Sequence, residues 1–501
     1  MKAERSFRHH AAQAGGLLRR GPITGIFLAL ILLAGCAVGP DYERPAVDTP
    51  PEHRRADSDP AAAEGTSSFG DLGWAEVFVD PVLRGYLAEA LTNNWDVKIA
   101  AARVLQAQAS ARVVRSQYYP NVALGGDLVT TRTSEEGPFA VPPGSDPEAT
   151  YGTAFASMSS YEVDLWGRIR RASEGARARL LATEAAQESV RQTLVAEVAA
   201  AYVILLQLDY ELEISRRTYL VRTNSLNLTT ARQEGGVASM QDVVQARVLV
   251  DTADAATVDV LRRQEQQENV LGLLLGRNPG TLARGRPLRE QPTLADVPPG
   301  LPSSLLERRP DVRAAEQQLV AANASVGEAR AAFFPQLSLT GMFGFQSVSL
   351  GDLFTSPAQI WQFGPTLVFP VFTGGRLKGQ YELAKGRFDE AVAQYRQSVQ
   401  GAFREVSDAL IQHQRTREFT VRQERVTQSR REGAELANIR YDGGVTSYLE
   451  VLYSEEELFT AELALARAIG DELLSYARLY RALGGGWTGP GLELAGATAQ
   501  P

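Results

Sequence analysis

The sequence predicts an α+β chain in which very long helices alternate with a few strands, built from two copies of one plan. The chain has 25 prolines, yet none lies in the stretches 168–276 and 371–489. Because helix interiors exclude proline, both stretches predict long helices. Residues 151–165 and 337–346 alternate apolar with small or polar side chains, which is the period of a strand. Finally, the two halves match each other in order, which indicates an internal duplication.

The duplication is visible as ordered identities at a nearly constant offset. Asp96-Val97 aligns with Asp311-Val312, and Tyr118-Tyr119-Pro120 meets Phe333-Phe334-Pro335 at the same offset of 215. Further on the offset becomes 208, where Gly235-Gly236-Val237 matches Gly443-Gly444-Val445. A single change of offset over such a distance is not expected by chance. Each copy therefore contains a helix, two strands, a very long helix, a Gly-Gly turn and a return helix.

The lengths of the predicted helices set the shape of each copy. At ~1.5 Å per residue, a helix over 168–234 would be roughly 100 Å long. The return helix 239–276 would cover roughly 57 Å and the helix 96–119 roughly 36 Å, so the two together nearly equal the long one. An apolar stripe at helical spacing predicts the side of the long helix that packs on its neighbours: Val195, Val198, Ala199, Tyr202 and Leu206.

The N-terminus has the pattern of an export signal. Five basic residues precede a short apolar stretch from Ile23 to Leu33, which is followed by Ala34-Gly35-Cys36. The stretch is too short for a permanent membrane span, so residues 1–35 predict a cleaved signal peptide. Cys36 is the only cysteine, which excludes an internal disulfide and favours an attachment site. Ordinary secretion with an incidental cysteine is the alternative.

Composition excludes several classes of function. The formal charge is −8, and it becomes about −12 once the basic signal is removed, which does not suit nucleic acid. Only four histidines exist, two of them in the signal, and His53 and His413 lack partners at metal-site or triad spacing. No phosphate-binding loop motif occurs. We therefore expect no enzyme, no metal site and no cofactor. Leu33-Ala34-Gly35-Cys36 resembles the bacterial lipoprotein box, and that resemblance implies a covalent lipid on Cys36.

The strands predict an oligomer if they cross a membrane. Tyr151, Phe155, Tyr161, Val163 and Leu165 would share one apolar face, and Glu162 and Asp164 would lie on the polar face. No apolar run long enough for a membrane helix follows the signal, so a membrane-spanning region would have to be a closed barrel. Four strands per chain cannot close one, whereas three chains would supply twelve. A soluble sheet with one buried face shows the same alternation and stays an alternative.

Several motifs in the same order resemble the TolC/OprM-type outer-membrane efflux factors, and within them the NodT-like lipoprotein branch. The resemblance covers nearly the whole mature chain, from Cys36 to about Trp487. The matching stretches are Cys36-Ala37-Val38-Gly39-Pro40-Asp41-Tyr42, Tyr161-Glu162-Val163-Asp164-Leu165-Trp166-Gly167-Arg168, Leu306-Glu307-Arg308-Arg309-Pro310-Asp311-Val312-Arg313, Phe333-Phe334-Pro335, and Tyr441-Asp442-Gly443-Gly444-Val445-Thr446-Ser447-Tyr448-Leu449-Glu450.

The resemblance implies an architecture and a set of partners. We expect a homotrimer with a shared twelve-strand transmembrane β-barrel and an α-helical barrel in the periplasm, lipid-anchored in the outer membrane of a Gram-negative cell. The partners would be a periplasmic adaptor, an inner-membrane transporter and outer-membrane lipid. The expected divisions are a lipoprotein signal (1–35), an N-terminal tether and equatorial segment (36–94), repeat 1 (95–276), an equatorial linker (277–310), repeat 2 (311–484) and a flexible tail (485–501).

The resemblance also places a gate and adaptor-docking region at the Gly-Gly turns. The residues that match the family's tips are Gly235, Gly236, Val237, Ser239, Asp242, Asp442, Gly443, Gly444, Val445, Ser447, Tyr448 and Glu450. Simple helix capping also explains the glycines. Where the family often has Asp past the turn, this chain has Tyr453, so Asp242 and Glu450 are the candidates for an acidic ring. Arg232, Glu234, Arg440 and Asp442 could form pairs that close the tips.

The expected function is a passive exit channel of a tripartite efflux pump that carries drugs, solvents or metal ions. Glu162 and Asp164 are expected to face the lumen, although support for the turn at Trp166-Gly167 is an alternative role. Two other functions remain open. One is the outer-membrane channel of a type I protein secretion system, and the other is a periplasmic helical rod tethered through Cys36.

Overall fold

The computed structural model describes residues 37–50, 69–134, 136–138, 142, 144, 146–292 and 305–485. The predicted signal peptide, Cys36, much of the tether, part of the inter-repeat linker and nearly all of the C-terminal tail lie outside the described residues. The chain divides into two compact units. The strand unit contains Met1–Asp41, Val113–Glu174 and Asn323–Lys385, and the helical unit contains Tyr42–Arg112, Gly175–Ala322 and Gly386–Pro501. Both units take segments from both predicted repeats.

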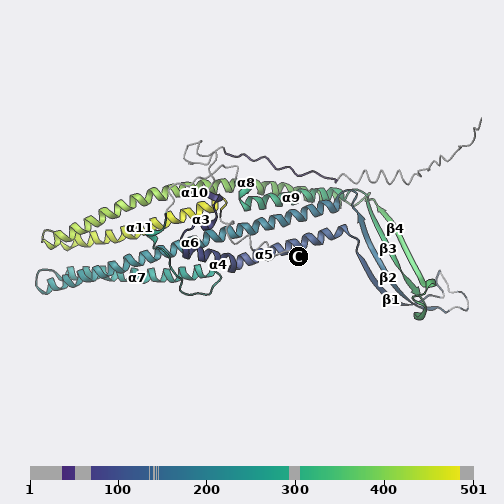
Figure 1. The fold of residues 1–501 in the computed structure, drawn as a ribbon, viewed down its shortest axis with the longest axis horizontal. Coiled ribbons are helices and arrows are strands. Elements are labelled where there is room, and N and C mark those ends of the chain that lie inside the picture. The colour runs from purple at the N-terminus through teal and green to yellow at the C-terminus, as the bar shows by residue number, and fades with distance from the viewer. Residues whose placement is uncertain are drawn as a thin grey trace, which may run out of the picture. The chain divides into compact units, whose positions relative to one another are not determined.

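The strand unit is built on one antiparallel sheet with the order β1-β2-β3-β4 (Figure 1). The strands are β1 (Val122–Arg132), β2 (Glu148–Val163), β3 (Gln336–Ser347) and β4 (Gln359–Val368). The first predicted repeat supplies β1 and β2, and the second supplies β3 and β4, so the β2–β3 pairing joins the repeats. Each of β1 and β4 has a strand partner on one side only.

One face of the sheet is apolar and exposed. The register aligns Leu124 with Ala156, Ala156 with Phe343, and Phe343 with Trp361, so these side chains share a face. Leu124 is 86% exposed and Trp361 is 75% exposed. The opposite face carries Asp127, Thr153, Gln346 and other mostly small or polar residues. We call these two surfaces the apolar face and the polar face.

A β-bulge in β2 overturns one prediction about these faces. Met158 pairs with Gly341, but the next aligned pair is Tyr161 with Leu339, so β2 carries one extra residue at Ser159-Ser160. An extra residue reverses the alternation beyond it. Tyr161 and Val163 therefore lie on the apolar face as expected, whereas Tyr151 and Phe155 lie on the polar face. The expectation that all these side chains share one face was wrong.

The helical unit consists mainly of two long hairpins, α6 (Arg168–Glu234) with α7 (Met240–Leu274) and α10 (Arg376–Asp442) with α11 (Tyr448–Ala482) (Figure 1). The first residues of α6 and α10 belong to the strand unit. The remaining helices are α3 (Trp74–Val77), α4 (Pro81–Asn93), α5 (Trp95–Arg115), α8 (Leu305–Arg308) and α9 (Pro310–Ala331). The observed α6 has the predicted bounds, and a 3-10 turn, Ser116–Tyr118, follows α5.

The main core lies where α6 packs on α7, α11 and the shorter helices. The predicted stripe is buried: Val198 and Ala199 are 0% exposed, and Tyr202 is 1% exposed. By length and composition α6 contains an 18-residue window of mean hydropathy 1.4, enough for a candidate membrane span, but 61% of that window is buried inside the protein. That burial is what the central helix of a water-soluble bundle shows, and it explains the apolar composition of α6.

Candidate functional site: the hairpin tips and the strand-to-helix junction

Both hairpin tips end in the same local structure. The amide of Val237 donates to the carbonyl of Arg232 at 2.9 Å, and the amide of Val445 donates to the carbonyl of Arg440 at 2.9 Å. Gly236 has φ of 81° and Gly444 has φ of 70°. These are Schellman caps, which require a left-handed residue that glycine adopts without strain. Capping therefore explains the second glycine of each pair, and this was predictable because a cap is local in sequence.

The return helices begin with different caps. Ser239 and Asp242 form a reciprocal capping box, in which the Ser239 hydroxyl accepts from the Asp242 amide at 3.1 Å and the Asp242 carboxylate accepts from the Ser239 amide at 3.0 Å. At the second tip the Ser447 side chain makes no cap hydrogen bond. There the Thr446 hydroxyl donates to Glu450, whose carboxylate also lies 3.5 Å from Arg440. Both candidate ring acids thus have partners within their own chain.

Tyr448 packs the two hairpins together near the tips. Its ring is 4% exposed and lies in a small core with Ala246 of α7 and Ala437 of α10. Burial is the main reason that the pKa of Tyr448 rises to about 12, against a smaller opposite effect of its hydrogen bond with Thr229. Tyr448 is therefore an uncharged, structural member of the predicted set, and the Tyr441 ring lies beside it in a tilted contact, with 5.1 Å between ring centroids.

An ion pair also links the hairpins. Arg232 of α6 donates to Asp442 of α10 at 3.0 Å, and its guanidinium lies 4.9 Å from the centre of the Tyr441 ring. Hydrogen bonds, first with Tyr441 and then with Asp442, raise the pKa of Arg232. Val237 and Val445 project from the turns and are 78% and 73% exposed. The structure therefore brings most of the predicted tip residues together, and it leaves the two valines free of intrachain packing.

Sequence reasoning missed a set of charged contacts farther along the helices. Glu211 of α6 is 0% exposed and accepts hydrogen bonds from Arg263 of α7 at 2.8 Å, Arg467 of α11 at 3.3 Å and Gln207 at 3.0 Å. Arg222 is 1% exposed and pairs with Glu456 at 2.9 Å. No periodic pattern identifies such pairs, because each partner lies on a different helix.

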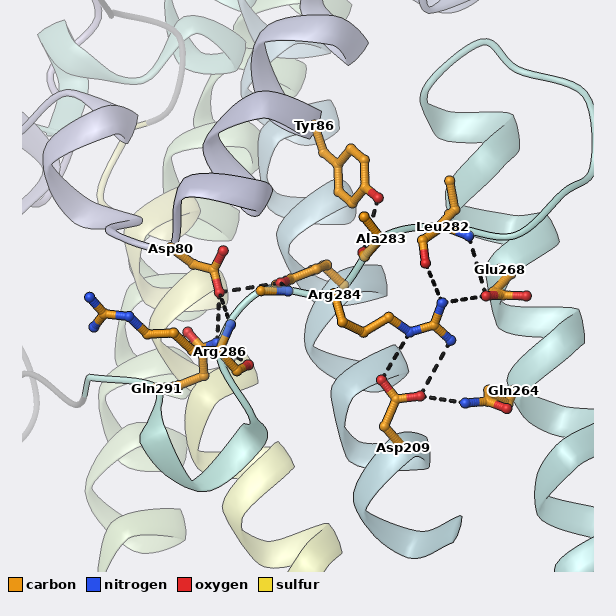
Figure 2. Close-up of polar contacts among 12 residues, drawn as sticks. Asp80, Tyr86, Asp209, Gln264, Glu268, Leu282, Ala283, Arg284, Arg286 and Gln291 are labelled. Carbon is orange, nitrogen blue, oxygen red and sulfur yellow. Dashed lines mark hydrogen bonds and ion pairs between the residues drawn. The ribbon is translucent and has the colours of Figure 1, made fainter. Parts of the chain in front are cut away.

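A second cluster of polar contacts, which sequence reasoning also missed, connects the start of the inter-repeat linker to the helices (Figure 2). The Asp80 carboxylate caps α4 and also accepts from the Arg286 amide at 3.0 Å and from the Gln291 amide group at 2.9 Å. Burial acts to raise the pKa of Asp80, but these hydrogen bonds outweigh it and keep the pKa below its usual value. Arg284 pairs with Asp209 and Glu268. The linker is therefore held by ionic contacts, as buried charges require.

His413 is buried between α10 and α11, where its Nδ1 lies 3.0 Å from the Ser475 hydroxyl and its ring lies 4.6 Å from the Tyr476 ring. Burial and then nearby Arg417 lower its pKa. The unfolded chain, with a pKa of about 6.5, therefore takes up the proton first as pH falls. We expect the unfolding free energy to decrease below about pH 6.5 by up to ~1.4 kcal/mol per pH unit.

The measurement for His413 is the unfolding free energy against pH, followed through the helical circular dichroism signal. His413→Gln keeps a polar side chain without the titration, so its curve should lose this part of the slope. An unchanged slope in His413→Gln would assign the pH dependence to other groups.

The strand-to-helix junction explains two of the sequence motifs. Asp164 accepts hydrogen bonds from the amides of Ile169 at 3.1 Å and Arg170 at 2.9 Å, which caps the start of α6. Glu162 pairs with Arg168 through two hydrogen bonds of 2.8 and 2.7 Å. Both acids therefore support the turn, which was the alternative role. Their exposure to a lumen stays a prediction.

Trp166 connects the motifs of the two repeats within the strand unit. Its ring stacks on Phe334 at 4.8 Å between centroids, and its indole nitrogen donates to the Pro335 carbonyl at 2.8 Å. The segment that follows Cys36 also packs here. The Val38 amide donates to the Trp166 carbonyl at 2.9 Å, and Asp41 pairs with Arg171 at 2.8 Å. A Cβ on Gly167 would lie 2.7 Å from the Cβ of Ala37, so glycine permits this contact.

No group of three or more His, Cys, Asp or Glu side chains that could hold a metal occurs in the part of the chain that the structure describes. The candidate sites described above are protein surfaces and contacts between structural elements. They contain helix tips linked by an ion pair, an apolar sheet face with open edges, and a junction that receives the N-terminal segment.

Comparisons with known proteins agree with this architecture. The family model described as outer membrane efflux protein matches residues 86–277 and 301–485. Two relatives from Pseudomonas putida are the solvent efflux pump outer membrane protein SrpC and the toluene efflux pump outer membrane protein TtgI. Each is 38% identical over 462 residues, covering 92% of this chain and 97% of the relative.

Among solved structures, the open state of the MtrE outer membrane channel of Neisseria gonorrhoeae superposes with a TM-score of 0.81 at 30% identity. It covers 90% of this chain and 99% of MtrE. The chain therefore belongs to the outer membrane efflux protein family, whose members are outer-membrane channel components of efflux pumps.

Proposed function

We propose that three copies of this chain form one passive exit duct through the outer membrane. The observation that carries the proposal is the four-stranded sheet, which exposes an apolar face and leaves an edge of both β1 and β4 unpaired. Neither feature is stable in a solitary sheet, because open edges and large apolar surfaces invite association. In a membrane every backbone group must be paired, so the edges of neighbouring copies join into one closed barrel.

The number of copies follows from strand arithmetic and the family. Membrane barrels begin at about eight strands, and three chains with four strands each supply twelve. The apolar face would contact lipid and the polar face would line the lumen. A lipid on Cys36 would add an anchor beside the sheet, because residues 37–41 pack on the strand-to-helix junction.

Crosslinking of the two sheet edges tests this assembly. Asp127 of β1 and Gln362 of β4 lie on the polar face at opposite edges of the sheet. We expect the Asp127→Cys, Gln362→Cys variant, treated with a flexible bifunctional maleimide, to run as a covalent trimer on a denaturing gel. Ser157→Cys, Met342→Cys is the matched control, because these partners face each other across β2 and β3 within one chain. If both variants stay monomeric, the shared barrel is wrong.

The partners follow from the family. Outer-membrane components of efflux pumps work with a periplasmic adaptor and an inner-membrane transporter. We infer that this chain meets its adaptor at the hairpin tips, where Val237 and Val445 project without intrachain packing. The same tips would close the duct, with Arg232 and Asp442 holding the two hairpins of one chain together. Asp242 and Glu450 are the candidate acids for this constriction, where rings of acids favour cations.

The energy for transport would come from the transporter, and the duct itself would catalyse nothing. The family is a channel family and not an enzyme family. Because SrpC and TtgI are named for solvent and toluene efflux, we propose small lipophilic compounds as cargo in preference to metal ions. The same relatives favour efflux over protein secretion or a tethered structural rod.

A further inference from the structure

The bulge in β2 gives the polar face an aromatic patch. Tyr151 and Phe155 are the aromatic residues of β1 to β4 on that face, where their neighbours include Asp127, Thr153 and Ser157. The other aromatic side chains of these strands lie on the apolar face, as Phe343 and Trp361 do. Because Ser159-Ser160 adds one residue to β2, the placement of Tyr151 and Phe155 follows from backbone pairing and not from chance exposure.

Two glycines of the neighbouring strands leave room for the Phe155 side chain. Phe155 lies between Gly125 of β1 and Gly344 of β3 in the register. A Cβ on Gly125 would lie 2.7 Å from the tip of the Phe155 ring, and a Cβ on Gly344 would lie 2.7 Å from the Phe155 Cβ. At Gly125 an added side chain would therefore meet the ring, whereas at Gly344 it would meet the Phe155 backbone and Cβ and the carbonyl of Ala154. The ring thus lies over Gly125 on the polar face, where the Phe155 side chain is only partly buried.

We propose that Phe155, together with Tyr151, is an aromatic contact site for lipophilic and aromatic cargo inside the exit duct. This inference rests on the proposed function, because the polar face becomes the inner wall only when copies share a barrel. Three copies would place three Phe155 rings at one level of the lumen. An aromatic face attracts organic cations and other rings by roughly 0.5–1.5 kcal/mol each, which favours contact without trapping the cargo.

A purely structural role is the competing explanation, because an aromatic ring laid over strand glycines also shields the backbone. The two roles differ in what they require. Shielding needs bulk, which leucine supplies, whereas recognition of aromatic cargo needs the ring. Phe155→Leu therefore separates them, and Phe343→Leu makes the same chemical change on the apolar face as a matched control.

The experiment measures block of the ion current in planar bilayers by tetraphenylphosphonium and by tetraethylammonium, two monovalent cations with and without rings. We expect Phe155→Leu to raise the half-blocking concentration of tetraphenylphosphonium by about three- to tenfold and to leave that of tetraethylammonium unchanged. Phe155→Tyr should block like the wild type, and so should Phe343→Leu. Equal block of Phe155→Leu and wild type would overturn the site, as would an equal shift for both cations.

Two further outcomes keep the test decisive. If Phe155→Leu does not assemble, Tyr151→Leu removes the second ring without touching the glycine contacts, and a roughly twofold or larger rise for tetraphenylphosphonium is expected. No selective change in Tyr151→Leu would then refute the aromatic site. An absence of any current from the wild type and also from Arg232→Ala, Asp442→Ala would instead refute the proposed duct, so failure of the two proposals can be told apart.

Discussion

Replacing Glu211 with alanine is expected to lower the unfolding free energy of the helical unit by about 3 kcal/mol. The carboxylate is fully buried and joins three helices through Arg263, Arg467 and Gln207. Its removal leaves two arginines without their shared partner and opens a small cavity. The loss stays below the ~5 kcal/mol extreme for buried pairs, because the side chains of Arg263 and Arg467 are 32% and 57% exposed and can regain water.

Thermal unfolding followed by the helical circular dichroism signal measures the effect of Glu211→Ala. Glu213→Ala is the matched control, because Glu213 is an exposed glutamate two residues away on the same helix. Surface substitutions of this kind usually change stability by less than about 0.5 kcal/mol. If both variants unfold together, the contacts of Glu211 contribute little and the helices are held by apolar packing alone.

Removal of the tip ion pair is expected to open the duct. Arg232→Ala, Asp442→Ala deletes the 3.0 Å contact between the hairpins and the cation–ring contact with Tyr441. An exposed pair contributes ~0–1 kcal/mol, so about 0.5 kcal/mol in each of three copies amounts to roughly a tenfold rise in open probability. Asp242→Ala and Glu450→Ala, which remove the other acids of the tips, test the same constriction.

Single-channel recording in planar bilayers checks this expectation. Arg404→Ala, Asp408→Ala is the matched control, because it removes an exposed ion pair confined to α10. A similar rise in that control would mean that any loss of surface charge alters the current. Wild-type behaviour of Arg232→Ala, Asp442→Ala would show that the pair does not hold the tips closed.

Much of the fold was predictable because its signals are local. Proline-free stretches and Gly-Gly caps determined α6 to the residue, and strand alternation found β2 and β3. The faces of β2 were not predictable in the same way. Two consecutive serines look ordinary in a strand, and only pairing with β3 reveals that one residue is extra. The alternation of side chains holds on each side of the bulge but not across it. For that reason it assigned Tyr151 and Phe155 to the wrong face.

The site shows the same division between local and distant causes. The caps at the two Gly-Gly turns are a local pattern, and sequence alone indicates them. The partner of Arg232 is 210 residues away, and that of Arg222 is 234 residues away. For Arg232 the sequence indicates only a group of charged residues beside the turns, which includes Asp442, and for Arg222 nothing in it selects Glu456. Which charges meet is decided by the docking of the two hairpins, through apolar residues such as Tyr448.

Because residues 37–41 pack on the strand-to-helix junction, the proposed lipid attachment site is only one residue away from the folded protein. Cys36 is one peptide unit, about 3.8 Å, from Ala37, which lies against Gly167 at the strand-to-helix junction. A long flexible linker would let the acyl chains insert at many positions relative to the sheet. A connection of one residue would keep the acyl chains close to the strand-to-helix junction. The lipid would then constrain how deeply the sheet inserts into the membrane.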